Sequence, residues 1–590
     1  MKRLISKRFY SDVVLTHAHA RLCVALRESF REGYGLREFK KDAIAGIIVG
    51  IVALPLSMAL AIATGLPPEY GIYTSIVAGI LTAVFGGSRV QVSGPTAAFI
   101  VILVPITAKF GFAGLALSTM IAGLMLMAMG LSGMGRLIAF IPNPVTTGFT
   151  AGIAVVIATI QVKDFLGLDL VKIPNHFLEK LSAMYGAMPS FRISDAVVGL
   201  VTLAILIIGN KRMKKIPAPL LALATASVLG ILIEQFFPGS GAITIKDRFA
   251  TSYAPQGIPH GLPFPDWPWH FHAPSDVPIA WSPEVIKEII LAAFAIAVLG
   301  AIESLLSATI ADGMTKRSHD PNAELVGQGI GNVVAPFFGG FAATGAIART
   351  ATSIRFGAIS PIACVVHSVF ILFAVLVFAP FLGYLPMASL AALLLMVAWH
   401  MSEARHFAHT LRIAPRSDVV VLLLCFGLTV FFDMVVAVMV GVMLAAVLFM
   451  RRMAAVSGTR LVSPESEEYG EPLPEGIFIY EIAGPLFFGA AQKAMSEIGA
   501  IRNLHAEVKV VLMDMRKVPF MDMTGLVNLT SALETLEKHG IRVILAGVNK
   551  QPIRIIAKAR LKRDRKLLTV SRSFDKALND ARAAVSGTQD

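Results

Sequence analysis

Long apolar runs recur between Ala43 and Met450, and they constrain the fold of this chain more than any other feature. Runs of about 20 apolar residues cross the hydrocarbon core of a bilayer as helices. The composition agrees, because 55% of the residues are hydrophobic and only 15% are charged. Beyond residue 452 the charge density is ordinary and no such run occurs. We therefore expect a multi-pass membrane domain followed by a soluble domain.

Fourteen membrane-spanning segments are predicted, and both termini are then expected on the cytoplasmic side. This assignment gathers Lys and Arg in the inner connections, for example at Arg89, Lys211 and Arg317, in agreement with the positive-inside rule. The outer connections carry few cations except in two loops, around Lys172 and Lys246. The predicted segments are 43–64, 70–86, 95–109, 113–132, 143–162, 193–209, 216–236, 284–308, 323–337, 345–358, 360–381, 385–400, 417–432 and 434–450.

The remaining stretches complete the predicted domain organisation. The C-terminal part alternates strand-like and helix-like patterns, which indicates an α/β domain with strands at 477–480, 508–513 and 541–546 and helices at 490–501 and 524–538. The expected divisions are a basic N-terminal segment at 1–41, a transport domain at 42–452, a linker at 453–475, the α/β domain at 476–585 and a tail at 586–590.

Composition also argues against several other classes. The three cysteines have no paired spacing, so neither a disulfide framework nor a metal site is expected. The basic N-terminus lacks the short apolar region and cleavage site of a signal peptide. The net charge of +13 is accounted for by inner loops rather than by nucleic-acid binding. No nucleophile–base pair or metal-ligand cluster suggests an enzyme, and no cofactor is expected beyond a coupling ion.

One stretch, Gly86–Phe99, interrupts the membrane-spanning pattern with glycines, an arginine and a short alternating segment. Ser93-Gly94-Pro95 then has the features of a helix start, with a hydroxyl for the N-cap and a proline whose missing N–H is tolerated there. Non-helical backbone at membrane depth occurs where it is buried in protein or lines a cavity. A half-helix that begins in mid-membrane presents free N–H groups and a partial positive charge, so we predict an anion site.

A similar pattern recurs in the second half, where Phe338-Gly339-Gly340 precedes Thr344-Gly345 and a second short helix. The two patterns fall in the third and tenth predicted segments, so each repeat holds seven segments. Because seven is odd, the second repeat is inverted relative to the first. Interrupted helices at matching positions of two inverted halves indicate a transporter substrate site. A chance match in a glycine-rich membrane protein is the alternative.

Four motifs carry a resemblance to a known family: QVSGPTAAF, LVGQGIGNVVAPFFGG, TGAIART and VPFMDMTGL. Together they resemble the bacterial SulP permeases of the solute carrier 26 family, over nearly the whole chain. The resemblance implies seven-plus-seven inverted repeats, a core domain that moves against a gate domain, and a cytoplasmic STAS domain. It also implies a homodimer in the bacterial inner membrane. Two further stretches, KDFLGL at 163–168 and MVAW at 396–399, are most similar to the branch of the family that transports C4-dicarboxylic acids with protons.

The resemblance places the anion between the two half-helices, with the first segment lining the other side. On that segment, Leu56 replaces the glutamine of some relatives and makes this side more apolar. Ala346 and Ala348 replace serines of some relatives, so fewer hydroxyl contacts are expected. Two closely packed helices of small residues are the structural alternative. The residues assigned to substrate binding are Ser57, Ser93, Gly94, Thr96, Ala97, Thr344, Gly345, Ala346, Ile347, Ala348 and Arg349.

Arg349 is the most informative single residue. A charge at the centre of a spanning helix costs at least ~2.5–3.5 kcal/mol and usually marks function. Glu303 in the eighth segment is the candidate counter-charge, and an acidic residue faces the site there in the family. Burial and a neighbouring cation act in opposite directions on the protonation of a carboxylic acid, so Glu303 is assigned to proton coupling. The alternative is a permanent Glu303–Arg349 ion pair that only holds two helices together.

Other polar residues are interpreted as structural. Asp312, Glu324 and Asn332 are expected to cap loops and join helices, and Asp433 is expected to be solvated. In the STAS domain, Met523 occupies the position of the phosphorylated serine of anti-sigma antagonists, so a phosphorylation switch is not expected there, although Thr524 follows. Dimer contact or docking of a cytosolic protein is the expected role of that domain.

Three functions remain open at this point. The favoured one is a secondary active transporter that takes up C4-dicarboxylates (succinate, fumarate, aspartate) with protons. Sulfate or bicarbonate as the substrate, and sodium as the coupling ion, are alternatives. An uncoupled anion channel would share the fold, and a receptor that signals through the STAS domain would need no transport cycle.

Overall fold

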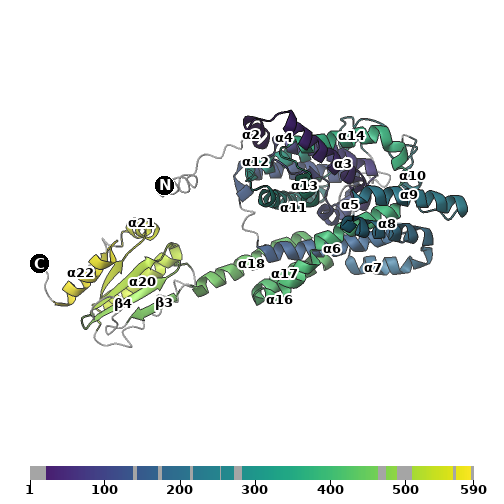
Figure 1. The fold of residues 1–590 in the computed structure, drawn as a ribbon. Helices are drawn as coiled ribbons and strands as arrows, with labels where there is room; N and C mark the ends of the chain where they lie inside the picture. Colours follow the sequence, from purple (N-terminus) through teal and green to yellow (C-terminus); the bar gives the residue numbers. More distant parts are fainter. Residues whose placement is uncertain are drawn as a thin grey trace. The chain divides into compact units, whose positions relative to one another are not determined.

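The structure of the 590-residue chain is a computed structural model. The description covers residues 22–136, 142–170, 174, 176–212, 217–252, 254–271, 282–432, 434–456, 458–462, 473–487, 508–561 and 567–586. The chain divides into two compact units, Met1–Val442 and Met443–Asp590, and each is described by itself. Many of their elements are labelled in Figure 1.

Helices occupy all the predicted membrane-spanning segments. Seven of the described helical segments are long and apolar enough to cross a membrane by length and composition. Segments three and four form one assigned helix with a kink at Gly111, whose φ is 63°. The helices that match the predicted segments are α3 (Leu36–Ala63), α4 (Pro68–Phe85), α5 (Ala97–Leu131), α6 (Asn143–Phe165), α8 (Ile193–Arg212), α9 (Ala218–Phe236), α11 (Pro283–Thr315), α12 (Pro321–Val334), α13 (Ile347–Arg355), α14 (Ile362–Leu382), α15 (Met387–Ser402), α17 (Arg416–Phe431) and α18 (Met434–Val456).

Shorter helices connect these spans: α2 (Val24–Arg31), α7 (Phe177–Gly186), η2 (Met188–Ser190), α10 (Ile245–Phe249), η3 (Ala335–Phe338) and α16 (Ala404–Ile413). The spans pack in two groups. The core bundle consists of α3, α4, α5, α11, α12, α13 and α14, and the gate bundle contains α6, α8, α9, α15 and α17. Each bundle therefore draws helices from both halves of the sequence, as two intertwined repeats require.

The two predicted helix interruptions lie side by side in the core bundle. Two short strands, β1 (Ser93–Gly94) and β2 (Thr344–Gly345), pair antiparallel. Ser93 pairs with Gly345 and Gly94 pairs with Thr344, so the matching dipeptides of the two halves face each other reciprocally. Such reciprocal pairing is expected where a two-fold axis relates the equivalent residues of two inverted repeats.

Glycines allow close helix packing in the core bundle. A Cβ on Gly329 of α12 would lie 2.6 Å from the carbonyl oxygen of Gly123 on α5, and a Cβ on Gly123 would lie 2.7 Å from that of Gly329. These carbonyl oxygens are backbone atoms and cannot move aside as a flexible side chain could. The two helices therefore pack this closely only because both residues are glycine.

We expect Gly329→Ala to lower the stability of the purified transport domain by about 1–3 kcal/mol, because the added methyl group forces α5 and α12 apart. The apparent melting temperature in detergent measures this effect. Gly427→Ala is the matched control, because a Cβ on Gly427 of α17 meets nothing within 4 Å. Equal melting temperatures for the two variants would contradict this account of the packing.

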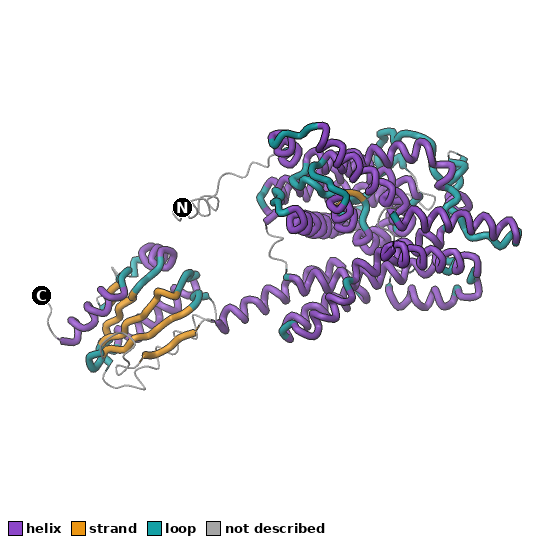
Figure 2. The backbone as a smooth tube through the Cα atoms, in the orientation of Figure 1, coloured by secondary structure: helices purple, strands orange, loops and turns teal. Residues whose placement is uncertain are grey.

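The C-terminal unit contains a five-stranded sheet in the order β3-β4-β5-β6-β7, shown as orange strands in Figure 2. Strand β3 (Gly458–Val462) runs antiparallel to β4 (Ile477–Ala483), and the other neighbours are parallel. The remaining elements are β5 (Val510–Lys517), α20 (Met523–Lys538), β6 (Arg542–Ala546), α21 (Lys550–Lys558), β7 (Leu568–Val570) and α22 (Phe574–Ser586).

Alternating residues of these strands pack into two hydrophobic cores, one on each face of the sheet. Val511 and Met513 pack with α20 and α21, whereas Val510 and Leu512 pack with α22 on the other face. The three predicted strands and the helix at 524–538 are confirmed. Strand β3 lies inside the stretch predicted as a linker, and β7, which has only three residues, was not predicted. The predicted helix at 490–501 lies outside the described residues, as does Asp433.

Candidate functional site

The candidate site is formed where the two half-helices begin. Helix α5 begins at Ala97 after Thr96, and α13 begins at Ile347 after Ala346. Both preceding residues are extended, and neither makes a side-chain cap hydrogen bond. The amide N–H groups of both first turns are therefore not capped by these side chains and can serve an anion.

The predicted start of the first half-helix is two residues early. Ser93 is not the N-cap but part of β1, and its Oγ donates to Gln328 Oε1 at 3.2 Å. The reason is that the chain first uses Ser93 and Gly94 to pair with β2 and bends into the helix only at Thr96.

Buried side chains satisfy the extended backbone around the two strands. Gln328 Nε2 and Asn332 Nδ2 both donate to the carbonyl oxygen of Ala343, at 2.7 and 3.0 Å. Thr344 Oγ1 donates to the carbonyl of Gly300 at 3.0 Å, and the Val92 amide donates to Thr350 Oγ1 at 3.0 Å. Irregular backbone at this depth is tolerated because the protein supplies such partners.

Arg349 lies on the first turn of α13 and is only 3% exposed. Its Nη2 donates to the carbonyl oxygen of Pro95, immediately before the first half-helix. Its Nε and Nη1 are buried and have no hydrogen-bond partner. A buried guanidinium with unmet donors carries a large desolvation cost unless an anion completes its contacts. Arg349 thus links the two half-helices and keeps two donors free.

Glu303 on α11 is partly buried and contacts the same segment. Its Oε2 accepts a hydrogen bond from Thr96 Oγ1 at 2.9 Å. No ion pair joins Glu303 to Arg349, although both lie in the described part of the chain. The interpretation of these residues as a permanent ion pair is therefore wrong for this structure. The two charged side chains instead hold neighbouring residues, Thr96 and Pro95.

Close contacts explain the glycines of both motifs. A Cβ on Gly94 would lie 2.8 Å from Arg349 Nη1 and 3.2 Å from Ser75 Oγ. Ser57 Oγ lies 2.6 Å from Ser75 Oγ, which brings the first segment to the same place. A Cβ on Gly345 would lie 1.9 Å from Gln91 Nε2. Ser75, Gln91 and Gln328 were missed from the sequence, although Ser75 and Gln328 are polar residues in predicted apolar segments and Gln91 lies in the interrupting stretch.

The other predicted site residues differ in their exposure to solvent. Ala97 and Ala346 are buried at the two helix starts. Ile347 is 37% exposed and Ala348 is also exposed, so the first turn of α13 is open on that side. Leu56 packs against Leu206 and neighbours in a cluster with α8, α9 and α15.

The polar residues interpreted as structural are confirmed in that role. Glu324 Oε2 accepts from the amides of Gly87 and Ser88, at 3.0 and 2.9 Å. Asp312 Oδ2 accepts from the backbone amide of His319 and lies 2.7 Å from its Nδ1. Within the described residues, no group of three His, Cys, Asp or Glu side chains could hold a metal ion.

Two half-helices whose starts pair antiparallel around a buried arginine define the class of this protein: a membrane transporter built on inverted repeats. The Sulfate permease family model matches residues 39–425, and the STAS domain model matches residues 472–577. The chain therefore belongs to the sulfate permease (SulP) family, whose members are anion transporters and not enzymes, and it carries a STAS domain.

Several known proteins are similar over most of their length. "Putative sulfate transporter YvdB" of Bacillus subtilis is 40% identical over 90% of this chain and 95% of its own. "Bicarbonate transporter BicA" of a Picosynechococcus species is 27% identical over 89% and 91%. The overall structure of SLC26A9 matches with a TM-score of 0.79 at 19% identity, covering 95% of this chain and 93% of that one. The fold is thus that of fourteen segments in seven-plus-seven inverted repeats.

Proposed function

We propose that this chain is a secondary active transporter that takes up C4-dicarboxylates with protons by alternating access. The observation that carries the proposal is Arg349, a buried guanidinium with two unpartnered donors between two half-helix starts without side-chain caps. One substrate carboxylate would bind Arg349 and the amide N–H groups of both first turns. The second carboxylate would extend toward the exposed side of α13, at Ile347 and Ala348.

Glu303 is proposed as the proton carrier. Its carboxylate contacts Thr96, the residue immediately before the first half-helix, so its charge lies beside the proposed position of the anion. Like charges in a low-dielectric site repel strongly, so an ionised Glu303 disfavours a bound dianion. Protonation removes that repulsion, and the proton then crosses the membrane with the substrate.

Sulfate is a second candidate substrate, and the relatives favour it. YvdB is named a sulfate transporter and BicA a bicarbonate transporter. A tetrahedral dianion would use the same Arg349 donors and helix starts. The two alanines at 346 and 348 supply no hydroxyl groups to a compact oxyanion, which favours a ligand with a carbon backbone.

The cellular setting is also part of the proposal. Both termini are proposed to lie in the cytoplasm and the protein in the bacterial inner membrane, which the positive charges in the predicted inner loops support. A homodimer, and a STAS domain that docks a cytosolic protein, are proposed on the family resemblance. An uncoupled channel or a pure receptor would not accumulate solute.

Uptake into proteoliposomes tests the substrate and the coupling ion together. Labelled succinate, sulfate and bicarbonate are offered separately under an imposed proton gradient and an imposed sodium gradient. We expect succinate to accumulate above its external concentration with the proton gradient only. Sulfate uptake without succinate uptake would overturn the dicarboxylate assignment, and uptake that never exceeds equilibrium would indicate a channel.

A further inference from the structure

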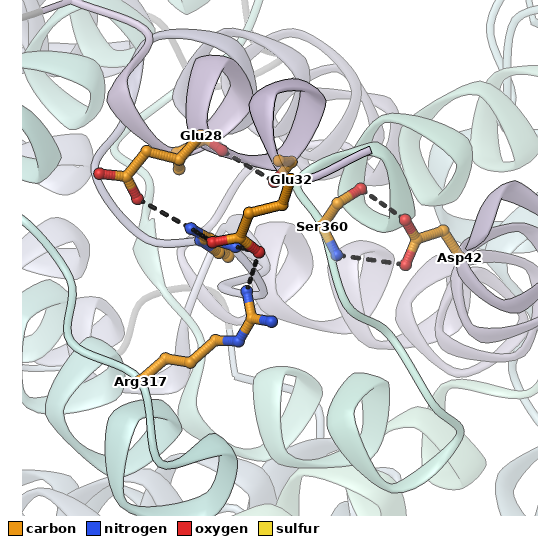
Figure 3. Close-up of polar contacts among 8 residues, drawn as sticks. Glu28, Glu32, Asp42, Arg317 and Ser360 are labelled. Atoms are coloured by element: carbon orange, nitrogen blue, oxygen red, sulfur yellow. Dashed lines mark hydrogen bonds and ion pairs between the residues drawn. The ribbon is translucent and has the colours of Figure 1, made fainter. Parts of the chain in front are cut away.

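A second cluster of charges lies where α2 docks on the transport domain (Figure 3). Glu32 follows α2, and its carboxylate is held between two arginines. Arg89 Nη1 and Nη2 donate to its two oxygens at 2.6 Å each, and Arg317 Nη1 donates at 2.9 Å. Arg89 Nη2 also donates to Glu28 at 3.0 Å.

Both arginines are close in sequence to elements of the candidate site. Arg89 lies in the stretch between α4 and β1, shortly before Ser93. Arg317 follows the end of α11, the helix of Glu303.

Open space surrounds the two arginines. A cavity of about 230 Å³ has Arg89, Arg317 and the carboxylate Asp312 in its lining. A second, of about 250 Å³, has the same two arginines together with Glu32 and Glu38. Each volume exceeds the space of several water molecules, so a small anion fits beside the guanidinium groups.

We propose that Arg89 and Arg317 form a second anion site, for a small carboxylate or sulfate, which Glu32 occupies in this structure as a tethered carboxylate. Two guanidinium groups that converge on one carboxylate give the paired geometry by which arginine recognises carboxylates and oxyanions. A free anion that takes this position displaces Glu32 and releases α2. The site is distinct from Arg349 and does not depend on the transported substrate.

The exposure of the pair makes this exchange feasible. The side chains of Glu32 and Arg317 are 53% and 51% exposed, whereas that of Arg89 is 14% exposed. Ion pairs so open to water are weak and are replaced by competing ions, while the more buried Arg89 keeps its position. The anion concentration, rather than a conformational change elsewhere, then controls whether α2 stays docked on the transport domain.

Titration of Glu32 does not control the docking of α2 near neutral pH. Hydrogen bonds from Arg89, and then from Arg317, lower the pKa of Glu32 to about 2. A carboxyl group with a lowered pKa contributes its stabilisation above its ordinary pKa and loses it as the pH falls through the lowered value. The docking therefore persists throughout the neutral range and responds to anions instead.

Native Cys23 provides the readout, because it directly precedes α2 and is partly buried, whereas Cys364 and Cys425 are buried in the helical bundles. The rate of maleimide labelling of Cys23 is measured on the full-length protein in zwitterionic nanodiscs. We expect sulfate or succinate to raise this rate about threefold or more over chloride at equal ionic strength. Glu32→Gln is expected to label rapidly in every salt.

Controls separate a specific site from other causes. Glu288→Gln removes another solvent-exposed carboxylate, paired with Lys109, and should label like wild type. Absence of label at Cys364 and Cys425 reports that each variant is folded. Equal rates in chloride and sulfate, or a wild-type rate for Glu32→Gln, would overturn the proposal. Acceleration by anionic lipid but not by soluble anions would assign the site to lipid headgroups and overturn it as well.

Discussion

Replacing Arg349 with Gln is expected to reduce anion transport by at least about 100-fold, because two charge-assisted hydrogen bonds to the substrate are lost. The variant also removes the donor to the Pro95 carbonyl, which joins the two half-helices. Initial rates of succinate and sulfate counterflow in proteoliposomes measure the effect. Counterflow needs no driving gradient, so it reports binding and translocation without coupling.

Arg355→Gln is the matched control for this prediction. Arg355 ends the same helix, α13, and is exposed rather than buried. It should keep near-normal counterflow, and both variants should elute as wild type in size-exclusion chromatography. If Arg349→Gln transports like Arg355→Gln, the guanidinium does not hold the anion.

Glu303→Gln is expected to separate exchange from accumulation. Glutamine retains an oxygen that can accept the hydrogen bond from Thr96, so the first half-helix keeps its support. It cannot carry a proton, and it presents no negative charge to the anion. Counterflow should therefore remain within about threefold of wild type, while accumulation driven by a proton gradient is lost.

The pH dependence gives the second half of this test. Counterflow by wild type should fall as the pH rises and Glu303 ionises, whereas counterflow by Glu303→Gln should be nearly independent of pH. Glu288→Gln, at an exposed ion pair, should behave as wild type. An unchanged pH profile in Glu303→Gln would remove Glu303 from the coupling mechanism.

Periodicity and turn signals were sufficient to predict the helices and the two interruptions. The apolar runs predict the membrane-spanning helices directly. The matching glycine motifs predict an internal repeat, and the pairing of β1 with β2 agrees with it. The location of the N-cap was not predictable, because Ser93 and Thr96 are both suitable residues and only the pairing with Gly345 decides between them.

Contacts between distant parts of the chain were not predictable from the sequence. Glu303 and Arg349 have opposite charges on neighbouring helices, which left a permanent ion pair as the alternative, yet they bond to Thr96 and Pro95, just before the first half-helix. That choice depends on side-chain directions set by helix rotation. The N-terminal segment was similarly interpreted from its Lys and Arg residues as a basic segment, whereas its acidic residues Glu28 and Glu32 accept hydrogen bonds from Arg89 of the transport domain.

The central claim is that one small anion binds between the two half-helix starts and Arg349. Equilibrium binding of labelled succinate and sulfate to the purified protein tests it most directly, with wild type, Arg349→Gln and Arg355→Gln measured side by side. The account predicts saturable binding of one anion per chain to wild type and Arg355→Gln, and none to Arg349→Gln. Saturable binding of equal affinity to all three proteins would contradict it.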